Sequence, residues 1–123
     1  MTRTTLVWLT GMVVVVALAG CGASGPGGRP VSAQAAPAAA VTIQTFQFQP
    51  GELTVTAGTR VTWTNQDAIT HTVTSGTPET RDGKFNSPLA GQGTKFAYTF
   101  AQPGTYTYFC DRHQSMRGQI RVN

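Results

Sequence analysis

The chain is poor in charged residues and in cysteine. Only 11% of its 123 residues are charged, nine of them basic and five acidic, and it contains two cysteines. No run of basic residues alternates with aromatic residues as a nucleic-acid groove requires, so nucleic acid is excluded as a partner. Residues 41–123 carry seven Lys and Arg against five Asp and Glu, a net charge of +2 that indicates no particular charged ligand.

Residues 41–123 also lack any segment whose apolar residues recur at helical spacing. These 83 residues are enough for one domain with a modest core. Gly, Pro, Asn and Asp separate short segments in which apolar and polar residues alternate, as in strands with one buried face. The alternating apolar residues are Val41 and Ile43; Leu53 and Val55; Val61 and Trp63; Phe96, Tyr98 and Phe100; and Tyr106, Tyr108 and Cys110. We therefore predict an all-β domain of seven or eight short strands, arranged as an antiparallel sandwich or a closed barrel.

The N-terminus has the layout of a secretory signal. One early cation, Arg3, precedes an apolar run over residues 6–19 that is too short to cross a bilayer comfortably. The run ends in "LAGC", residues 18–21, which resembles a bacterial lipoprotein signal that is cleaved before the cysteine. We expect residues 1–20 to be a signal peptide and Cys21 to carry the lipid. An uncleaved anchor, or cleavage near "AQAA" at residues 33–36, is the alternative.

Residues 21–40 predict a flexible tether. After Cys21 they are mostly Gly, Ala, Pro, Ser and Gln with a single charge, Arg29, a composition that cannot bury enough apolar surface to fold. By flexible-chain scaling such a segment reaches roughly 25 Å. We therefore expect the folded domain, residues 41–123, to lie outside the cytoplasm, anchored through lipid to the periplasmic side or outer surface of a bacterial membrane.

Few side chains of the domain suit soft or borderline metal ions. The candidates are His71, Cys110, His113, Met116 and, less readily, an acid such as Asp111. Cys110, His113 and Met116 lie on one tight loop after a strand, and His71 begins another strand. Two imidazoles and one thiolate with a weak axial thioether form the trigonal blue-copper ligand set.

The chemistry of Cys110 supports a metal site. Cys21 is either lipidated or removed, so Cys110 has no disulfide partner, and a free thiol would oxidise outside the cytoplasm. Zinc is disfavoured because its fourth ligand would be a thioether. Taken singly, each candidate has an ordinary structural reading, such as core packing for Met116, but their order and spacing favour copper. A catalytic pair of Cys110 and His113 lacks an orienting third group, so we expect no enzyme activity.

Four segments, "VTWTNQDAITHTV", "DGKFNSP", "YTFAQPGTYTYFCDRH" and "MRGQIRV", resemble blue copper proteins of the plastocyanin and amicyanin type. The Cys-x2-His-x2-Met spacing is similar to the short ligand loop of amicyanin. The resemblance implies a Greek-key cupredoxin sandwich with His71, Cys110 and His113 as equatorial ligands and Met116 as the axial one. It also implies that the Thr72 amide bonds the thiolate and that Asn65 links the copper loops. The family often has proline beside the ligand histidine, where this chain has Arg112 and Gln114.

These observations predict a membrane-tethered carrier of one electron, a monomer that uses one copper ion as Cu(I) and Cu(II). Its redox donor and acceptor are not identified by one sequence. A copper carrier or store is the alternative, although Met1 and Met12 fall in the signal and leave only Met116 in the mature chain. A metal-free adhesion module would not explain the ligand set. Arg112, Arg117 and Arg121 are either a docking patch or ordinary solvated charges.

Overall fold

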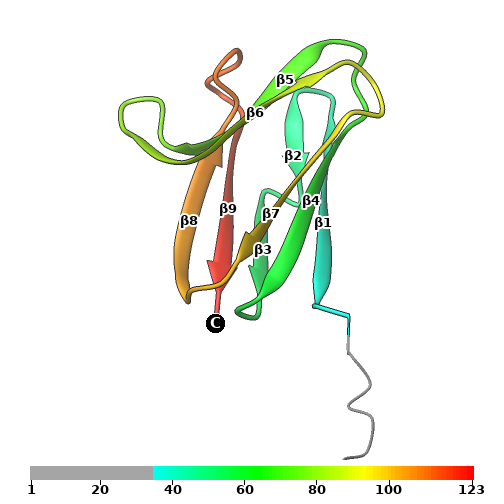
Figure 1. Cartoon of the computed structure of the whole chain (residues 1–123). Coiled ribbons are helices and arrows are strands. Elements are labelled where there is room, and N and C mark those ends of the chain that lie inside the picture. The colour runs from blue at the N-terminus through cyan, green and yellow to red at the C-terminus, as the bar shows by residue number, and fades with distance from the viewer. Residues whose placement is uncertain (1–34) are drawn as a thin grey trace, which may run out of the picture. The chain divides into compact units, whose positions relative to one another are not determined.

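Two β-sheets face each other across one apolar core in residues 35–123, the part of the chain that the computed structural model describes (Figure 1). The predicted signal peptide 1–20, the lipid site Cys21 and tether residues 22–34 lie outside the described residues. The strands are β1 (Ala38–Gln44), β2 (Gln47–Gln49), β3 (Glu52–Val55), β4 (Thr59–Asn65), β5 (Thr70–Gly76), β6 (Arg81–Ala90), β7 (Lys95–Phe100), β8 (Gly104–Phe109) and β9 (Arg117–Val122). No helix suited to crossing a membrane occurs among residues 35–123.

The two sheets confirm the predicted all-β sandwich. The first has the strand order β2-β1-β4-β7 and the second the order β3-β9-β8-β5-β6. Residues 35–123 form nine strands instead of seven or eight; β2, for example, has only three residues, which is too short to show alternation. Among the strands of residues 35–123, most pairs are antiparallel, as predicted, and two pairs, β1 with β4 and β3 with β9, are parallel. The consecutive strands that pair, such as β1 with β2, are antiparallel, whereas each parallel pair joins strands that are separated by others in the chain.

The first strand begins at Ala38, three residues before the expected start of the domain at Val41. Ala38–Ala40 lie parallel to Arg60–Thr62 of β4, and the Arg60 amide donates to the Pro37 carbonyl at 2.8 Å. Residues 38–40 were therefore wrongly assigned to the tether. Alanine has little strand preference of its own, and the strand forms because β4 supplies its backbone partners.

Aromatic side chains dominate the core between the sheets. Trp63 of β4 is fully buried and stacks on Phe96 with ring centroids 5.6 Å apart. Its other neighbours include Phe100 at 6.2 Å and, in the second sheet, Tyr108 at 5.3 Å in an edge-on arrangement. Burying one such side chain contributes about 2–3 kcal/mol. These contacts fix the separation of the two sheets, as the alternating pattern of β4, β7 and β8 predicts.

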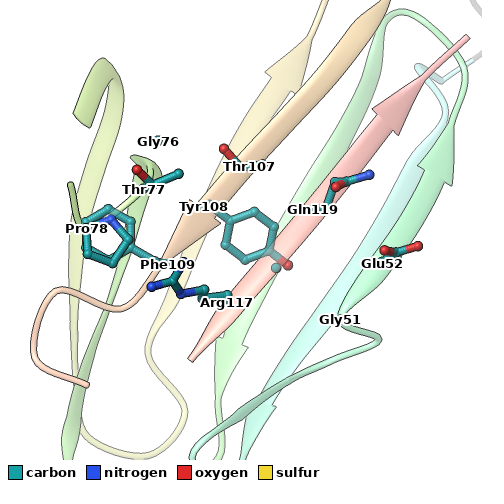
Figure 2. A pocket seen from close by; sticks show the side chains of 11 residues that line it. Gly51, Glu52, Gly76, Thr77, Pro78, Thr107, Tyr108, Phe109, Arg117 and Gln119 are labelled. Carbon is teal, nitrogen blue, oxygen red and sulfur yellow. The ribbon is translucent and has the colours of Figure 1, made fainter. Parts of the chain in front are cut away.

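Tyr108 carries a buried polar group into this core. Its hydroxyl and the Trp63 indole nitrogen have no hydrogen-bond partner within the described part of the chain. Burial raises the pKa of Tyr108 to about 12, only partly opposed by the neighbouring Trp63 side chain. The ring faces Gly118 of β9 directly across the strand pair. Tyr108 also lines a pocket of about 360 Å³ together with Phe109 and Arg117, whose side chains are labelled in Figure 2.

Candidate metal centre

The predicted ligands come from two places in the second sheet. His71 is the second residue of β5, and Cys110 follows the last residue of β8. The chain then turns through residues 111–116 and returns as β9, at the end of the domain that lies away from the C-terminus (Figure 1). His71 is thus held by a strand and the other candidates by a loop.

Backbone hydrogen bonds close the loop between its candidate ligands. The His113 amide donates to the Cys110 carbonyl at 3.2 Å, and the Met116 amide donates to the His113 carbonyl at 2.8 Å. The Cys110 amide in turn donates to the Met116 carbonyl at 3.1 Å. Each of the three residues is therefore bonded to the other two, and the loop keeps its shape without a proline.

Three donor atoms converge at this end of the sandwich. The Cys110 Sγ lies 3.8 Å from His71 Nδ1 and 3.6 Å from His113 Nδ1, and all three atoms lie within 4.8 Å of one another. With metal–nitrogen bonds of about 2.0 Å and a metal–sulfur bond of about 2.3 Å, as for zinc, a trigonal site separates sulfur from nitrogen by about 3.7 Å. The separations of 3.8 and 3.6 Å therefore fit one metal ion bound by all three atoms.

Burial differs among these residues. His71 and Cys110 are fully buried, Met116 is 3% exposed, and His113 is intermediate. Buried thiolate and imidazole ligands exclude water, whereas a partly exposed imidazole stays within reach of another molecule. His113 is therefore the candidate ligand through which the site meets the surface.

Thr72 connects β5 to the sulfur and to the loop. Its amide donates to Cys110 Sγ at 3.3 Å, the arrangement that the family resemblance implied. Its hydroxyl accepts the Asp111 amide at 2.7 Å and pairs with the Thr74 hydroxyl at 3.0 Å. Thr72, the residue after His71, thus links β5 to the loop that begins at Cys110.

Asn65 organises the loop that leads to His71. Fully buried, it donates through Nδ2 to the Ile69 carbonyl at 2.8 Å and to the Leu89 carbonyl at 3.0 Å. Its Oδ1 accepts the Asp67 amide at 2.9 Å. The side chain therefore joins the start and end of residues 65–69 and ties them to β6. These bonds do not reach residues 110–116, so a link between the two copper loops stays a prediction.

Two residues that the sequence interpretation missed also surround the imidazoles. Asp67 Oδ2 lies 2.9 Å from His71 Nε2. Because a carboxylate only accepts hydrogen bonds, Nε2 carries the imidazole hydrogen, and Nδ1 is left to bind the metal. The hydrogen bond from the Phe46 amide is the main cause that holds the pKa of Asp67 below its ordinary value, while desolvation acts in the opposite direction. The Phe46 ring meets His71 and His113 edge-on, with centroids 5.5 and 5.0 Å away. An acid four residues before a ligand histidine was the available signal for Asp67.

The charged candidates lie apart from the three donor atoms. Asp111 pairs with Arg81 and does not join the ligand cluster. Arg117 lies 3.5 Å from Glu79 and donates through Nε to the Gln114 carbonyl at 3.3 Å. Arg112, Arg117 and Arg121 are all exposed.

The family model for copper binding proteins of the plastocyanin/azurin family matches residues 35–123. The chain belongs to this family. It is 34% identical to amicyanin-alpha from Methylorubrum extorquens over 91 residues, which cover 72% of this chain and 76% of the relative. It is also 32% identical to plastocyanin from Scenedesmus fuscus over 83 residues, or 61% of this chain and 85% of that protein.

Solved cupredoxins have the same fold. The amicyanin structure from Paracoccus versutus matches with a TM-score of 0.63 and 30% identity, over 72% of this chain and 84% of that one. A purple cupredoxin from Nitrosopumilus maritimus matches with the same score and identity, over 69% of this chain and 99% of its own. Together with the geometry of the donor atoms, these matches establish this cupredoxin as a copper protein.

Proposed function

We propose that this cupredoxin is a one-electron carrier outside the cytoplasm, with copper bound by His71, Cys110, His113 and Met116. Copper supplies the Cu(I)/Cu(II) couple when bound. The convergence of one sulfur and two Nδ1 atoms, with S···N separations of 3.8 and 3.6 Å, is the observation that carries the proposal. A thiolate with two imidazoles and an axial thioether is typical of blue-copper electron-transfer sites.

The surroundings of the ligands favour a carrier that transfers electrons without rearranging. Transfer is fast when ligand positions change little with oxidation state. The backbone bonds between Cys110, His113 and Met116 hold the loop, and the Thr72 amide and hydroxyl hold the loop to β5. These contacts are made by backbone and short side chains, which have few alternative conformations.

The surface around His113 provides a route for electrons. Phe46 and Ile69, which are 52% and 40% exposed, are the large apolar side chains exposed within residues 35–123. The Phe46 ring touches His113, and Ile69 and His113 line one shallow pocket together with Arg112. We expect a redox protein, as donor or acceptor, to bind this apolar surface and exchange electrons through the His113 imidazole.

Copper titration and voltammetry test the electron-carrier proposal. The purified mature chain should bind one Cu(II), develop an intense visible band and give a reversible one-electron wave. A copper carrier or store would instead give up its metal rapidly to a competing chelator and show no reversible wave. Absence of the intense band from protein that has bound Cu(II) would contradict the ligand assignment.

Membrane attachment through Cys21 is a second part of the proposal. It is supported by "LAGC" and by the Gly, Ala and Pro residues that follow. Several acyl chains hold a protein at a membrane where one chain barely does. In the native host, the Cys21→Ala variant should leave the membrane fraction while a Gly22→Ala control stays there. A Cys21→Ala protein found wholly in membranes would rule out lipid as the anchor.

A further inference from the structure

One carboxylate joins the buried histidine to a turn that is distant in sequence. Asp67 Oδ2 accepts from His71 Nε2 at 2.9 Å and from the Phe46 amide at 3.1 Å, and its Oδ1 accepts the Thr45 amide at 2.9 Å. The Asp67 side chain is only 16% exposed. All three donors therefore reach a largely shielded charge, for which hydrogen bonds are strong.

The turn that Asp67 binds is one that its residues do not favour. Gln44 pairs with Gln47, so Thr45 and Phe46 form a two-residue turn between β1 and β2. Both have positive φ, 51° and 58°, a conformation that Asn and Gly adopt readily and β-branched or bulky residues rarely do. Such residues persist only where the surroundings over-determine them. The two amide bonds to Asp67 are the contacts that do so.

The position of this turn decides what covers the ligands. Phe46 is half exposed, yet its ring is nearly perpendicular to the rings of both His71 and His113, at 89° and 87°. Without the two amide bonds, the turn would relax towards conformations that Thr and Phe prefer. The Phe46 ring would then leave the imidazoles, and water would reach His113 more easily.

We propose that Asp67 is a positioning residue that controls both imidazoles, one directly and one through Phe46. This deepens the proposed function, since it rests on His71 and His113 being copper ligands. Directly, the carboxylate keeps the hydrogen of His71 on Nε2, so that Nδ1 faces Cys110 Sγ. A carboxylate on the far nitrogen also makes the imidazole a stronger donor, which favours Cu(II) over Cu(I). Indirectly, the carboxylate holds the Thr45–Phe46 turn over the site.

The test uses the mature chain with Asp67→Ala, Asp67→Asn and, as control, Asp82→Ala. Asp82 also accepts a backbone amide, that of Lys84 at 3.1 Å, so the control removes the same charge and the same kind of bond at the start of β6. In Asp67→Ala we expect Cu(II) affinity to fall 10–100-fold, as typically follows loss of a group that orients a metal ligand, and the reduction potential to rise. Asp67→Asn keeps an acceptor but loses the charge, so its affinity should fall less while its potential still rises.

Imidazole NMR of the metal-free protein separates this proposal from the proposed function. Wild type should show His71 as a single tautomer with hydrogen on Nε2, and contacts between the Phe46 and His113 rings. Asp67→Ala should show both tautomers and lose those contacts, while Asp82→Ala should match wild type. Unchanged tautomer, ring contacts, affinity and potential in Asp67→Ala would overturn the proposal. If wild type binds no copper but the NMR changes appear, the electron-carrier proposal fails and the positioning role stands for the apoprotein.

Discussion

Gly118→Ala tests how tightly the core is packed beside the ligand loop. A Cβ at residue 118 would lie 2.2 Å from Tyr108 Cζ and 2.4 Å from its hydroxyl oxygen. Non-bonded carbon atoms prefer about 3.5–4.0 Å, so the ring would have to move by more than about 1 Å. Trp63, with its centroid 5.3 Å away, and Phe48, at 4.8 Å, restrict that movement.

The expected cost follows from this geometry. Overfilling a packed core costs about 1–3 kcal/mol, and for a domain of this size each kcal/mol lowers the melting temperature by about 4–8 °C. Gly118 is not among the glycines with positive φ, so the cost reflects packing alone. Thermal unfolding of the metal-free variant, followed by circular dichroism, measures it.

Gly51→Ala is the matched control, because its Cβ would meet no atom closer than the Phe48 carbonyl oxygen at 3.8 Å. It should change stability by no more than about 0.5 kcal/mol. In a Tyr108→Leu background, Gly118→Ala should cost much less than in wild type, since the two residues share one space. An equal cost in both backgrounds, or a cost no larger than that of Gly51→Ala, would refute the packing argument.

Three further outcomes are expected. Cys110→Ser should lose the intense visible band in Cu(II) spectra because the band requires a thiolate; a retained band would show that Cys110 is not a ligand. Met116→Leu should remain coloured while its potential, measured by voltammetry, rises because a thioether donor is lost; a colourless, metal-free variant would assign Met116 a structural role. Burial raises the Tyr108 pKa from 10.0 to about 12, so the phenol ionises less readily in the folded chain than in the unfolded chain. The free energy of unfolding should therefore be unaffected below pH 10 and should fall by about 3 kcal/mol as the pH rises from 10 through 12. Denaturant unfolding at pH 9 and pH 12 should show that loss, and Tyr108→Phe should not share it.

The sequence was sufficient for the fold class and for the ligand cluster. Alternation in β4, β7 and β8 predicts buried faces, and the core contains Trp63, Phe100 and Tyr108 as that pattern requires. Three candidate ligands within seven residues can converge without knowledge of the rest of the fold. His71 joins these ligands only if its strand, β5, lies beside Cys110. The hydrogen bond from the Thr72 amide to Cys110 Sγ shows that it does.

Features that depend on pairing between distant segments could not be predicted. Ala38–Ala40 have no strand signal of their own and become a strand because β4 is beside them. The contact of Asp67 with Thr45 and Phe46 joins residues more than 20 positions apart, and no local pattern indicates it. Phe46 sits in a turn and is exposed, so no pattern of buried apolar residues indicates its place beside the imidazoles.

The residues around His113 show how this chain stiffens its ligand loop without proline. Arg112 and Gln114 leave the backbone on both sides of His113 free to rotate in principle. The loop is nevertheless constrained three times over: by the bonds among Cys110, His113 and Met116, by the Thr72 hydroxyl on the Asp111 amide, and by Phe46 against the imidazole. Each constraint comes from a different segment, so a substitution in one leaves two in place. A site held in this way can keep its ligand geometry in both oxidation states, which is what the proposed electron transfer at His113 requires.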